Sequence, residues 1–175
     1  SKLKKQNSLG DEVCVLIMQT EGLEDDIHGL IKEQEKFIGA SKKLKELGNL
    51  KGKISNKAST VKKEHKFFSK NTVCPTCTQD IDERLRLNKL DEAQQKAKEL
   101  QSGYQELEKA ITNEEERERQ FVQLTKESTT LTNEISQNNV KISGCQKQIR
   151  ELQSEIQIIT NQLENRNCLL YTSPS

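Results

Sequence analysis

The sequence predicts an all-α protein, a long antiparallel coiled-coil hairpin whose apex is a Cys-x-x-Cys loop. The first observation is composition: hydrophobic residues are 31% and aromatic residues 3%, whereas ordinary globular domains contain about 45–50% apolar residues. The second is a net charge of only +1 with both signs interspersed, which argues against disorder. The third is periodic apolar residues on both sides of one central loop. Two prolines in 175 residues agree with long helices.

The first arm is expected to be a helix over 1–70, because apolar residues alternate in steps of four and three. The seam is Leu9, Val13, Leu16, Thr20, Leu23, Ile27, Leu30, Gln34, Phe37, Ser41 and Leu44. Its phase then slips near Leu47 and Leu50. Gly48 and Gly52 fall in the same stretch, and each costs about 1 kcal/mol relative to alanine inside a helix. We therefore predict a joint near 44–54.

The second arm is expected to be a helix over 80–167. Its seam is Leu131, Ile135, Asn138, Ile142, Cys145, Ile149, Leu152, Ile156, Ile159 and Leu163. An interruption is expected near 114–124, where a charged run from Glu114 to Arg119 precedes a phase shift between Phe121 and Leu124. We interpret the charged run as a solvated helix face. Cys145 on the seam is interpreted as a small apolar core residue.

The two seams agree with each other if the chain reverses between Cys74 and Cys77. Residue i then lies opposite residue 151 − i, so that Leu16 faces Ile135. Asp80 is predicted to cap the second helix, with Glu83 three residues later as in a capping box. These choices leave 71–79 as the apical loop.

The loop contains Cys74-Pro75-Thr76-Cys77. This spacing lets two thiolates reach one metal ion, and Pro75 presets a tight turn. Zinc in a structural site takes four ligands, whereas this loop supplies only Cys74 and Cys77. The remaining histidines and cysteines are predicted not to complete the site. They are His28, His65, Cys14, Cys145 and Cys168. The sequence therefore predicts one zinc ion shared between the loops of two chains in a symmetric homodimer.

The loop also carries a resemblance. Cys-Pro-x-Cys at the apex of two coiled-coil arms resembles the zinc hook of the SbcC-type, SMC-like ATPases of DNA double-strand-break repair. The string from Phe67 to Ile81, with Phe-Phe, Asn71, Cys-Pro-Thr-Cys and Gln79, is more similar still to the large subunit of the tailed-phage recombination endonuclease. Many cellular hooks have glycine after the second cysteine, where this chain has Thr78, and this difference favours the phage type.

The resemblance implies a parent protein that holds and processes DNA ends. Its arms would join ATP-binding heads, which use ATP and magnesium and act with a nuclease subunit. This chain contains no Gly-x-x-x-x-Gly-Lys-Ser/Thr phosphate loop. We therefore expect the fragment to have no enzymatic activity of its own.

The compartment is predicted to be cytoplasmic, in a bacterial host cell if the protein is phage-encoded. The longest apolar run, from Val13 to Met18, is too short to span a membrane. The N-terminus lacks the pattern of a secretory signal. An odd number of cysteines, five, indicates a reducing compartment.

Three alternatives stay open. The chain could be a structural rod with incidental cysteines, or a thiol redox module, although no strand–helix context supports the latter. Ten lysines against two glutamates over 42–70 could make weak contact with a nucleic-acid backbone, but a solvated face is the preferred interpretation.

Residues 168–175 leave the heptad pattern, and we interpret them as foreign sequence after a truncated reading frame.

Overall fold

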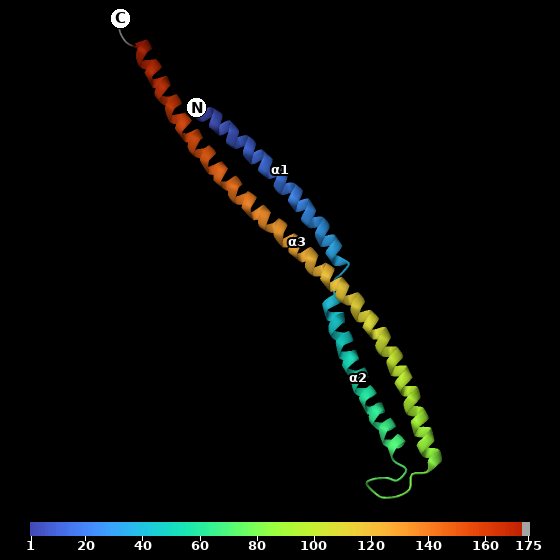
Figure 1. The fold of residues 1–175 in the computed structure, drawn as a ribbon. Helices are drawn as coiled ribbons and strands as arrows, with labels where there is room; N and C mark the ends of the chain where they lie inside the picture. The colour runs from blue at the N-terminus through green and yellow to red at the C-terminus, as the bar shows by residue number, and fades with distance from the viewer. Residues whose placement is uncertain (173–175) are drawn as a thin grey trace. The chain divides into compact units, whose positions relative to one another are not determined.

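The computed structural model describes residues 1–172, which form three helices (Figure 1). Helix α1 is Lys2–Glu35, helix α2 is Ala40–Lys70 and helix α3 is Glu83–Thr172. The described residues contain no strand, and their one β-bridge joins Val73 to Asp80. The predicted all-α class is therefore confirmed. No described helix combines the length and apolar character that a membrane span requires.

The chain divides into two compact units. The first comprises residues 1–36 together with the chain from residue 123 onward, and the second comprises residues 37–122. Helix α3 contributes to both units, so each unit consists of one shorter helix packed on part of α3.

In the first unit, α1 and the C-terminal part of α3 run in opposite directions. Contacts that advance along α1 move backwards along α3: Lys2 to Glu155 at 2.7 Å, Thr20 to Asn138 at 3.4 Å and Gln34 to Thr125 at 2.6 Å. The predicted seam of α1 is buried or half-buried from Leu9 to Phe37, which confirms the heptad phase there. Cys145 is buried, as expected of a small core residue.

The predicted pairing of the arms is wrong by one heptad. Thr20 was expected to face Leu131, but its side chain lies 3.4 Å from that of Asn138, seven residues further on. A slide of seven residues keeps every apolar position of both seams facing inward, so periodicity alone does not select between the two registers. Polar partners do distinguish them, because the Asn138 amide donates to the hydroxyl of Thr20, which is itself buried.

In the second unit, α2 packs on the N-terminal part of α3. The buried apolar side chains here are small or medium-sized: Ala40, Val61, Ala93 and Leu107. A groove of about 630 Å³ lies in this unit and is lined by Ala93, His65 and Tyr104 among others.

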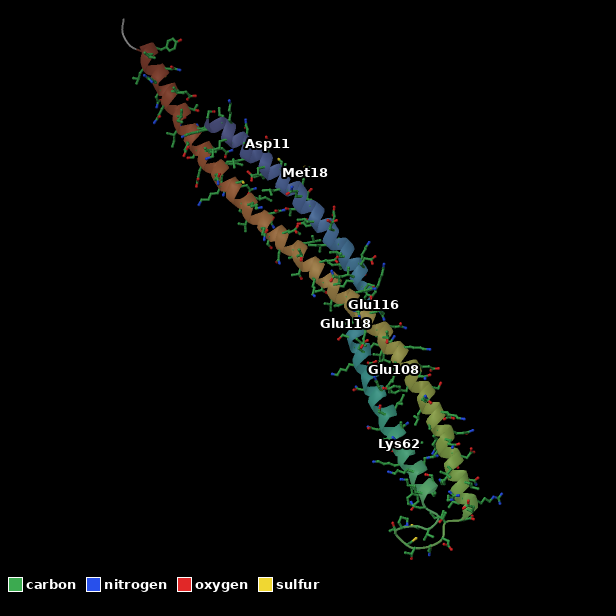
Figure 2. The ribbon with its side chains drawn as sticks, in the orientation of Figure 1. Asp11, Met18, Lys62, Glu108, Glu116 and Glu118 are labelled. Carbon is green, nitrogen blue, oxygen red and sulfur yellow. The ribbon has the colours of Figure 1, made fainter. Side chains whose placement is uncertain are left out.

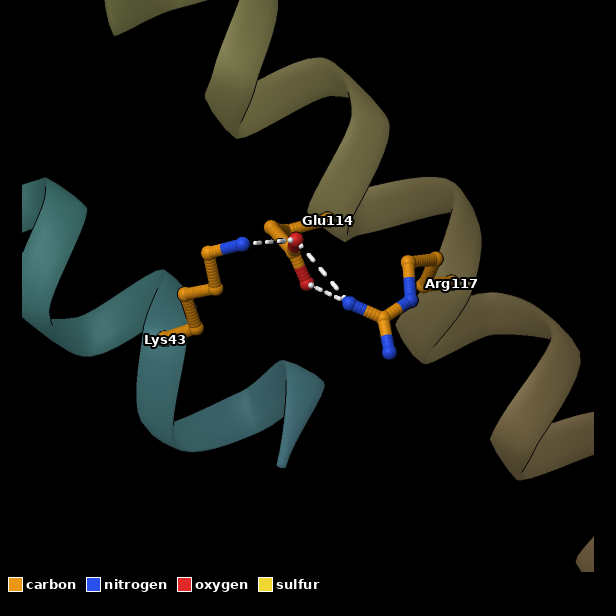
Figure 3. A network of polar contacts seen from close by, with 3 residues as sticks. All are labelled: Lys43, Glu114 and Arg117. Atoms are coloured by element: carbon orange, nitrogen blue, oxygen red, sulfur yellow. Dashed lines mark hydrogen bonds and ion pairs between the residues drawn. The ribbon is translucent and has the colours of Figure 1, made fainter. Parts of the chain in front are cut away.

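Glu114 is not part of a solvated face, so that interpretation of the charged run is wrong at this residue. Its side chain is only 7% exposed. Its carboxylate forms one ion pair with Lys43 of α2 at 2.9 Å and another with Arg117 at 3.0 Å (Figure 3). Lys43 and then Arg117 hold the pKa of Glu114 below its ordinary value. A charged layer therefore replaces an apolar layer at this point of the seam.

The predicted joint at 44–54 is also misplaced, because α2 continues through Gly48 and Gly52. The first arm is instead interrupted at residues 36–39, where Gly39 adopts a left-handed conformation with φ of +88°. Glycine is the residue that tolerates this conformation without strain. The two midhelix glycines have only a modest helix penalty, which does not break a helix packed on a partner.

The ends of α3 differ from the prediction. The helix begins at Glu83 rather than at Asp80, because the backbone of Asp80 is occupied by the bridge to Val73. It continues through Cys168 to Thr172, so the first part of the predicted non-heptad tail is helical. Leu169, Leu170 and Tyr171 are nevertheless strongly exposed there. Residues 173–175 of that tail lie outside the described residues.

Candidate metal centre

The loop between α2 and α3 comprises residues 71–82 and folds back on itself through backbone hydrogen bonds. The amide of Cys74 donates to the Gln79 carbonyl at 2.8 Å, and the amide of Ile81 donates to the Thr72 carbonyl at 2.8 Å. These two bonds flank the Val73–Asp80 bridge. The loop is therefore a short reversal closed by one β-bridge, and the cysteines occupy its closed end.

The two predicted metal ligands, Cys74 and Cys77, lie together in that closed end. The Thr78 amide donates to the Cys74 carbonyl at 2.9 Å, which closes one tight turn around the pair. Cys74 is half-buried and Cys77 is exposed, and both are free thiols. Two thiols in one turn are the arrangement in which both can ligate the same ion.

The backbone of this turn favours a thiolate at Cys74. Hydrogen bonds from the backbone amides of Cys77 and then Thr76 lower the pKa of the Cys74 thiol, and the side chain of Cys77 also contributes. Donors aimed at a sulfur stabilise its charged form. The thiolate is the form of cysteine that binds metals, and the lowered pKa of Cys74 favours that form.

Thr78 is the one residue other than glycine with a positive φ in the described part of the chain, at +60°. A left-handed conformation costs a β-branched residue about 1–2 kcal/mol. The side chain of Thr78 offsets part of this cost by donating its hydroxyl to the Cys77 carbonyl at 2.7 Å. Glycine at this position would adopt the same turn without the strain, and Thr78 adopts it with the help of its own side chain.

The base of the loop is fixed by Asn71, which belongs to the Phe67–Ile81 string, and by Arg86, for which the sequence predicted no role. Asn71 donates both its backbone amide, at 3.1 Å, and its side-chain amide, at 3.0 Å, to the Phe67 carbonyl at the end of α2. Arg86 of α3 donates to the Phe68 carbonyl at 3.2 Å. Both satisfy carbonyl groups that a helix end leaves without intrahelical partners.

Arg86 is itself held in place by Glu83. The guanidinium donates to both carboxylate oxygens of Glu83, at 2.6 and 3.0 Å, and this pairing raises the pKa of Arg86 and lowers that of Glu83. The rings of Phe67 and Phe68 meet edge to face with centroids 5.1 Å apart beside this contact. Arg86 therefore ties the start of α3 to the end of α2. The signal available in the sequence was Glu83 three residues before Arg86, a spacing that places both on one helix face.

The loop contains two candidate metal ligands, Cys74 and Cys77. Among residues 1–172, no cluster of three or more histidine, cysteine, aspartate or glutamate side chains is placed to hold a metal ion. Cys14, Cys145 and Cys168 all belong to the first unit, whereas the loop belongs to the second. Within one described chain, Cys74 and Cys77 therefore form a pair rather than a complete tetrahedral site.

The comparisons with known proteins do not extend this description. No protein-family model, curated protein or solved structure matches the chain. The chemistry of the loop is therefore the basis for the proposed function.

Proposed function

We propose that this chain is a zinc-dependent dimerisation arm, in which Cys74 and Cys77 of two copies share one zinc ion. The observation that carries the proposal is a pair of free thiols in the closed end of one tight turn between two helices, which a hydrogen bond from the Thr78 amide to the Cys74 carbonyl closes. The lowered pKa of Cys74 supports it. Two such pairs would supply the four ligands of a tetrahedral structural site. In this proposal the complete chain is an antiparallel coiled-coil hairpin with the zinc-hook loop at its apex.

Zinc would provide most of the affinity between the two loops. The loop offers little apolar surface for a protein interface, with Phe67 37% exposed and Val73 43% exposed. Structural zinc sites contribute about 10–16 kcal/mol near neutral pH, which is enough to join two small surfaces that would not associate otherwise. The contact would be isologous, because the same loop is used on both sides.

The resemblance of residues 67–81 to zinc hooks extends the proposal to the parent protein. The parent would be an ATPase of DNA double-strand-break repair and recombination that acts with a nuclease subunit, most similar to the tailed-phage type. The chain itself would tether two such ATPases and would not hydrolyse ATP or cut DNA. The parent would act in the cytoplasm, in a bacterial host cell if it is phage-encoded.

The test is the effect of the two cysteines on association. We expect Cys74→Ser and Cys77→Ser, alone or together, to convert a zinc-dependent dimer into a monomer in sedimentation experiments. Cys14→Ser is the matched control, because Cys14 is an exposed thiol in the first unit. A dimer that persists in the double variant would overturn the proposal and leave the structural-rod interpretation.

A thiol-redox role is the second candidate, and the lowered pKa of Cys74 favours it. The two roles differ in a simple measurement. A redox pair would form a reversible Cys74–Cys77 disulfide at physiological potentials and would not bind zinc between two chains. Thiol titration of the chain with and without bound zinc separates them, since ligated thiolates react slowly.

A further inference from the structure

Helix α2 is strongly basic, unlike the rest of the chain. It carries ten lysines and two glutamates over Ala40–Lys70, although the whole chain has a net charge of only +1. The remainder of the chain is therefore net negative. Such segregation of charge onto one helix is not required for packing, because only Lys43 and Lys51 form ion pairs with α3.

The unpaired lysines gather on the side of α2 that faces solvent. Six exposed lysines lie opposite the seam at helical spacing and form no ion pair with any described residue: Lys42, Lys45, Lys53, Lys63, Lys66 and Lys70. Lys57 and Lys62 flank this group, and Lys62 is labelled in Figure 2. We call the six residues the lysine face.

Most residues between these lysines on the exposed side of α2 are short, and Phe67 is the exception. Gly48 and Gly52 lie on the same side, with open space where a side chain would be, and Asn56 and Ser59 are small and polar. From Lys42 to Lys70 the face extends roughly 42 Å at about 1.5 Å per residue. A DNA duplex of about 12 base pairs has the same length at about 3.4 Å per base pair.

We propose that the lysine face binds the phosphate backbone of duplex DNA without reading its sequence. The face is long, narrow and rich in cations, which suits a stiff linear polyanion. It has ammonium groups for phosphates and no arginine fork for base edges. An anionic membrane is a poorer match, since a helix at a membrane surface needs a continuous apolar face and Phe67 is the only large apolar residue on this one.

This proposal does not depend on the cysteine loop of residues 71–82, because it rests on charges along α2 and not on zinc. The experiment therefore uses the Cys74→Ser/Cys77→Ser chain. Its binding is followed by fluorescence anisotropy with a mixed-sequence duplex of about 25 base pairs, roughly twice the length of the face. Six phosphate contacts predict that log K falls with log salt with a slope of about −5.

The variant Lys53→Gln/Lys63→Gln/Lys66→Gln removes three of the six charges. We expect affinity to fall at least about ten-fold and the slope to weaken by about 3. The control variant Lys126→Gln/Lys141→Gln/Lys147→Gln removes three exposed lysines of α3 in the first unit, and its affinity should change by less than about two-fold. Helix content by circular dichroism checks that both variants fold.

Three results would overturn the proposal. One is equal loss of affinity in the two triple variants, which would mean nonspecific attraction to the whole chain. Another is tighter binding to anionic phospholipid vesicles than to the duplex at the same salt concentration. The third is that the lysine face associates with a second copy of the chain, since α1 has eight carboxylates and four lysines. That association would appear as self-association at low salt that DNA does not displace.

Discussion

The helices are interrupted at residues 36–39 and at residues 71–82, and a different type of residue adopts the left-handed conformation in each interruption. Each contains one left-handed residue. At the first interruption it is Gly39, which adopts a φ of +88° at no steric cost, and no atom lies within 4 Å of where a Cβ would be. At the second it is Thr78, which is strained at +60° and is held by hydrogen bonds to Cys74 and Cys77.

This difference indicates which interruption has a function beyond connection. Strained backbone persists only where its surroundings fix it, and such strain is frequent at ligand sites. The turn at Thr78 is fixed by the backbone bond to the Cys74 carbonyl and by a side-chain hydroxyl that donates to the Cys77 carbonyl, whereas Gly39 has no side chain and its carbonyl accepts from the Lys43 amide. We therefore interpret 36–39 as a joint and 71–82 as a binding site.

Zinc should produce the largest contrast between the two turns. We expect zinc to slow hydrogen exchange strongly at the amides of Cys74, Thr78 and Ile81, which donate within the loop. The amides of Ala40 and Lys43 at the joint should exchange at unchanged rates. Amide exchange by NMR, with zinc and with a chelator, measures both in one sample. Equal slowing at both turns would contradict the comparison.

Removing Arg86 should give the next largest effect. Arg86→Ala deprives the Phe68 carbonyl of a partner and leaves Glu83 without its cation, so the melting temperature of the metal-free chain should fall. Arg84→Ala is the matched control, because Arg84 is exposed and forms no ion pair among the described residues. Thermal unfolding by circular dichroism measures both. A smaller fall for Arg86→Ala than for Arg84→Ala would show that the base of the loop is not held as described.

Replacing Gly39 tests the joint alone. Gly39→Ala should destabilise the chain by about 1–2 kcal/mol, since a Cβ meets nothing but the backbone must keep a positive φ. Gly48→Ala is the opposite control: it lies within α2 with open space around it and should stabilise by about 1 kcal/mol. Urea unfolding of both variants gives the values. The same sign for both changes would mean that Gly39 is not the residue that interrupts the helix.

Relieving the strain at Thr78 should have a smaller effect. Thr78→Gly removes the steric cost but adds freedom to the unfolded chain, so we expect a net gain of at most about 1 kcal/mol. Zinc-dependent dimerisation should be retained, because the Thr78 amide that donates to Cys74 remains. Loss of zinc binding in this variant would show that the threonine hydroxyl, not the backbone conformation, forms the site.

Low pH should have the smallest effect on stability, and it should act through the ion pairs of Glu114 in the second unit. The pKa of Glu114 is lowered by Lys43 and Arg117, so its ion pairs stabilise the fold fully above the ordinary glutamate pKa of about 4.3. That contribution is lost as the pH falls through the lowered pKa of the folded chain. Glu114→Gln should therefore show a weaker dependence of melting temperature on pH between about pH 6 and 3. An unchanged dependence would mean that Lys43 does not pair with Glu114 in solution.

Much of this fold follows from sequence because heptad spacing fixes which face of each helix is buried. The first-arm seam from Leu9 to Phe37 is buried or half-buried, and the cysteine pair lies in the loop of residues 71–82, as the residue pattern predicts. The register did not follow, since a slide of one heptad preserves the same pattern. It depends on single polar contacts such as Thr20 with Asn138.

The joint and the charged layer did not follow from sequence for another reason. Gly39, Gly48 and Gly52 are the same residue type, so residue type does not show which of them interrupts the helix. Tertiary packing decides this. Glu114 resembles its exposed neighbours Glu115 and Glu116 in residue type, yet it is buried and pairs with Lys43 of α2. Local propensity carries no information about a partner that is distant along the chain.

The central claim is that the cysteine loops of two chains share one zinc ion, and native mass spectrometry of the zinc-loaded chain tests it most directly. The account predicts a species of two chains and one zinc ion, which a chelator converts to single chains without metal. One zinc ion on each single chain, or a two-chain species that retains its mass without zinc, would contradict the account.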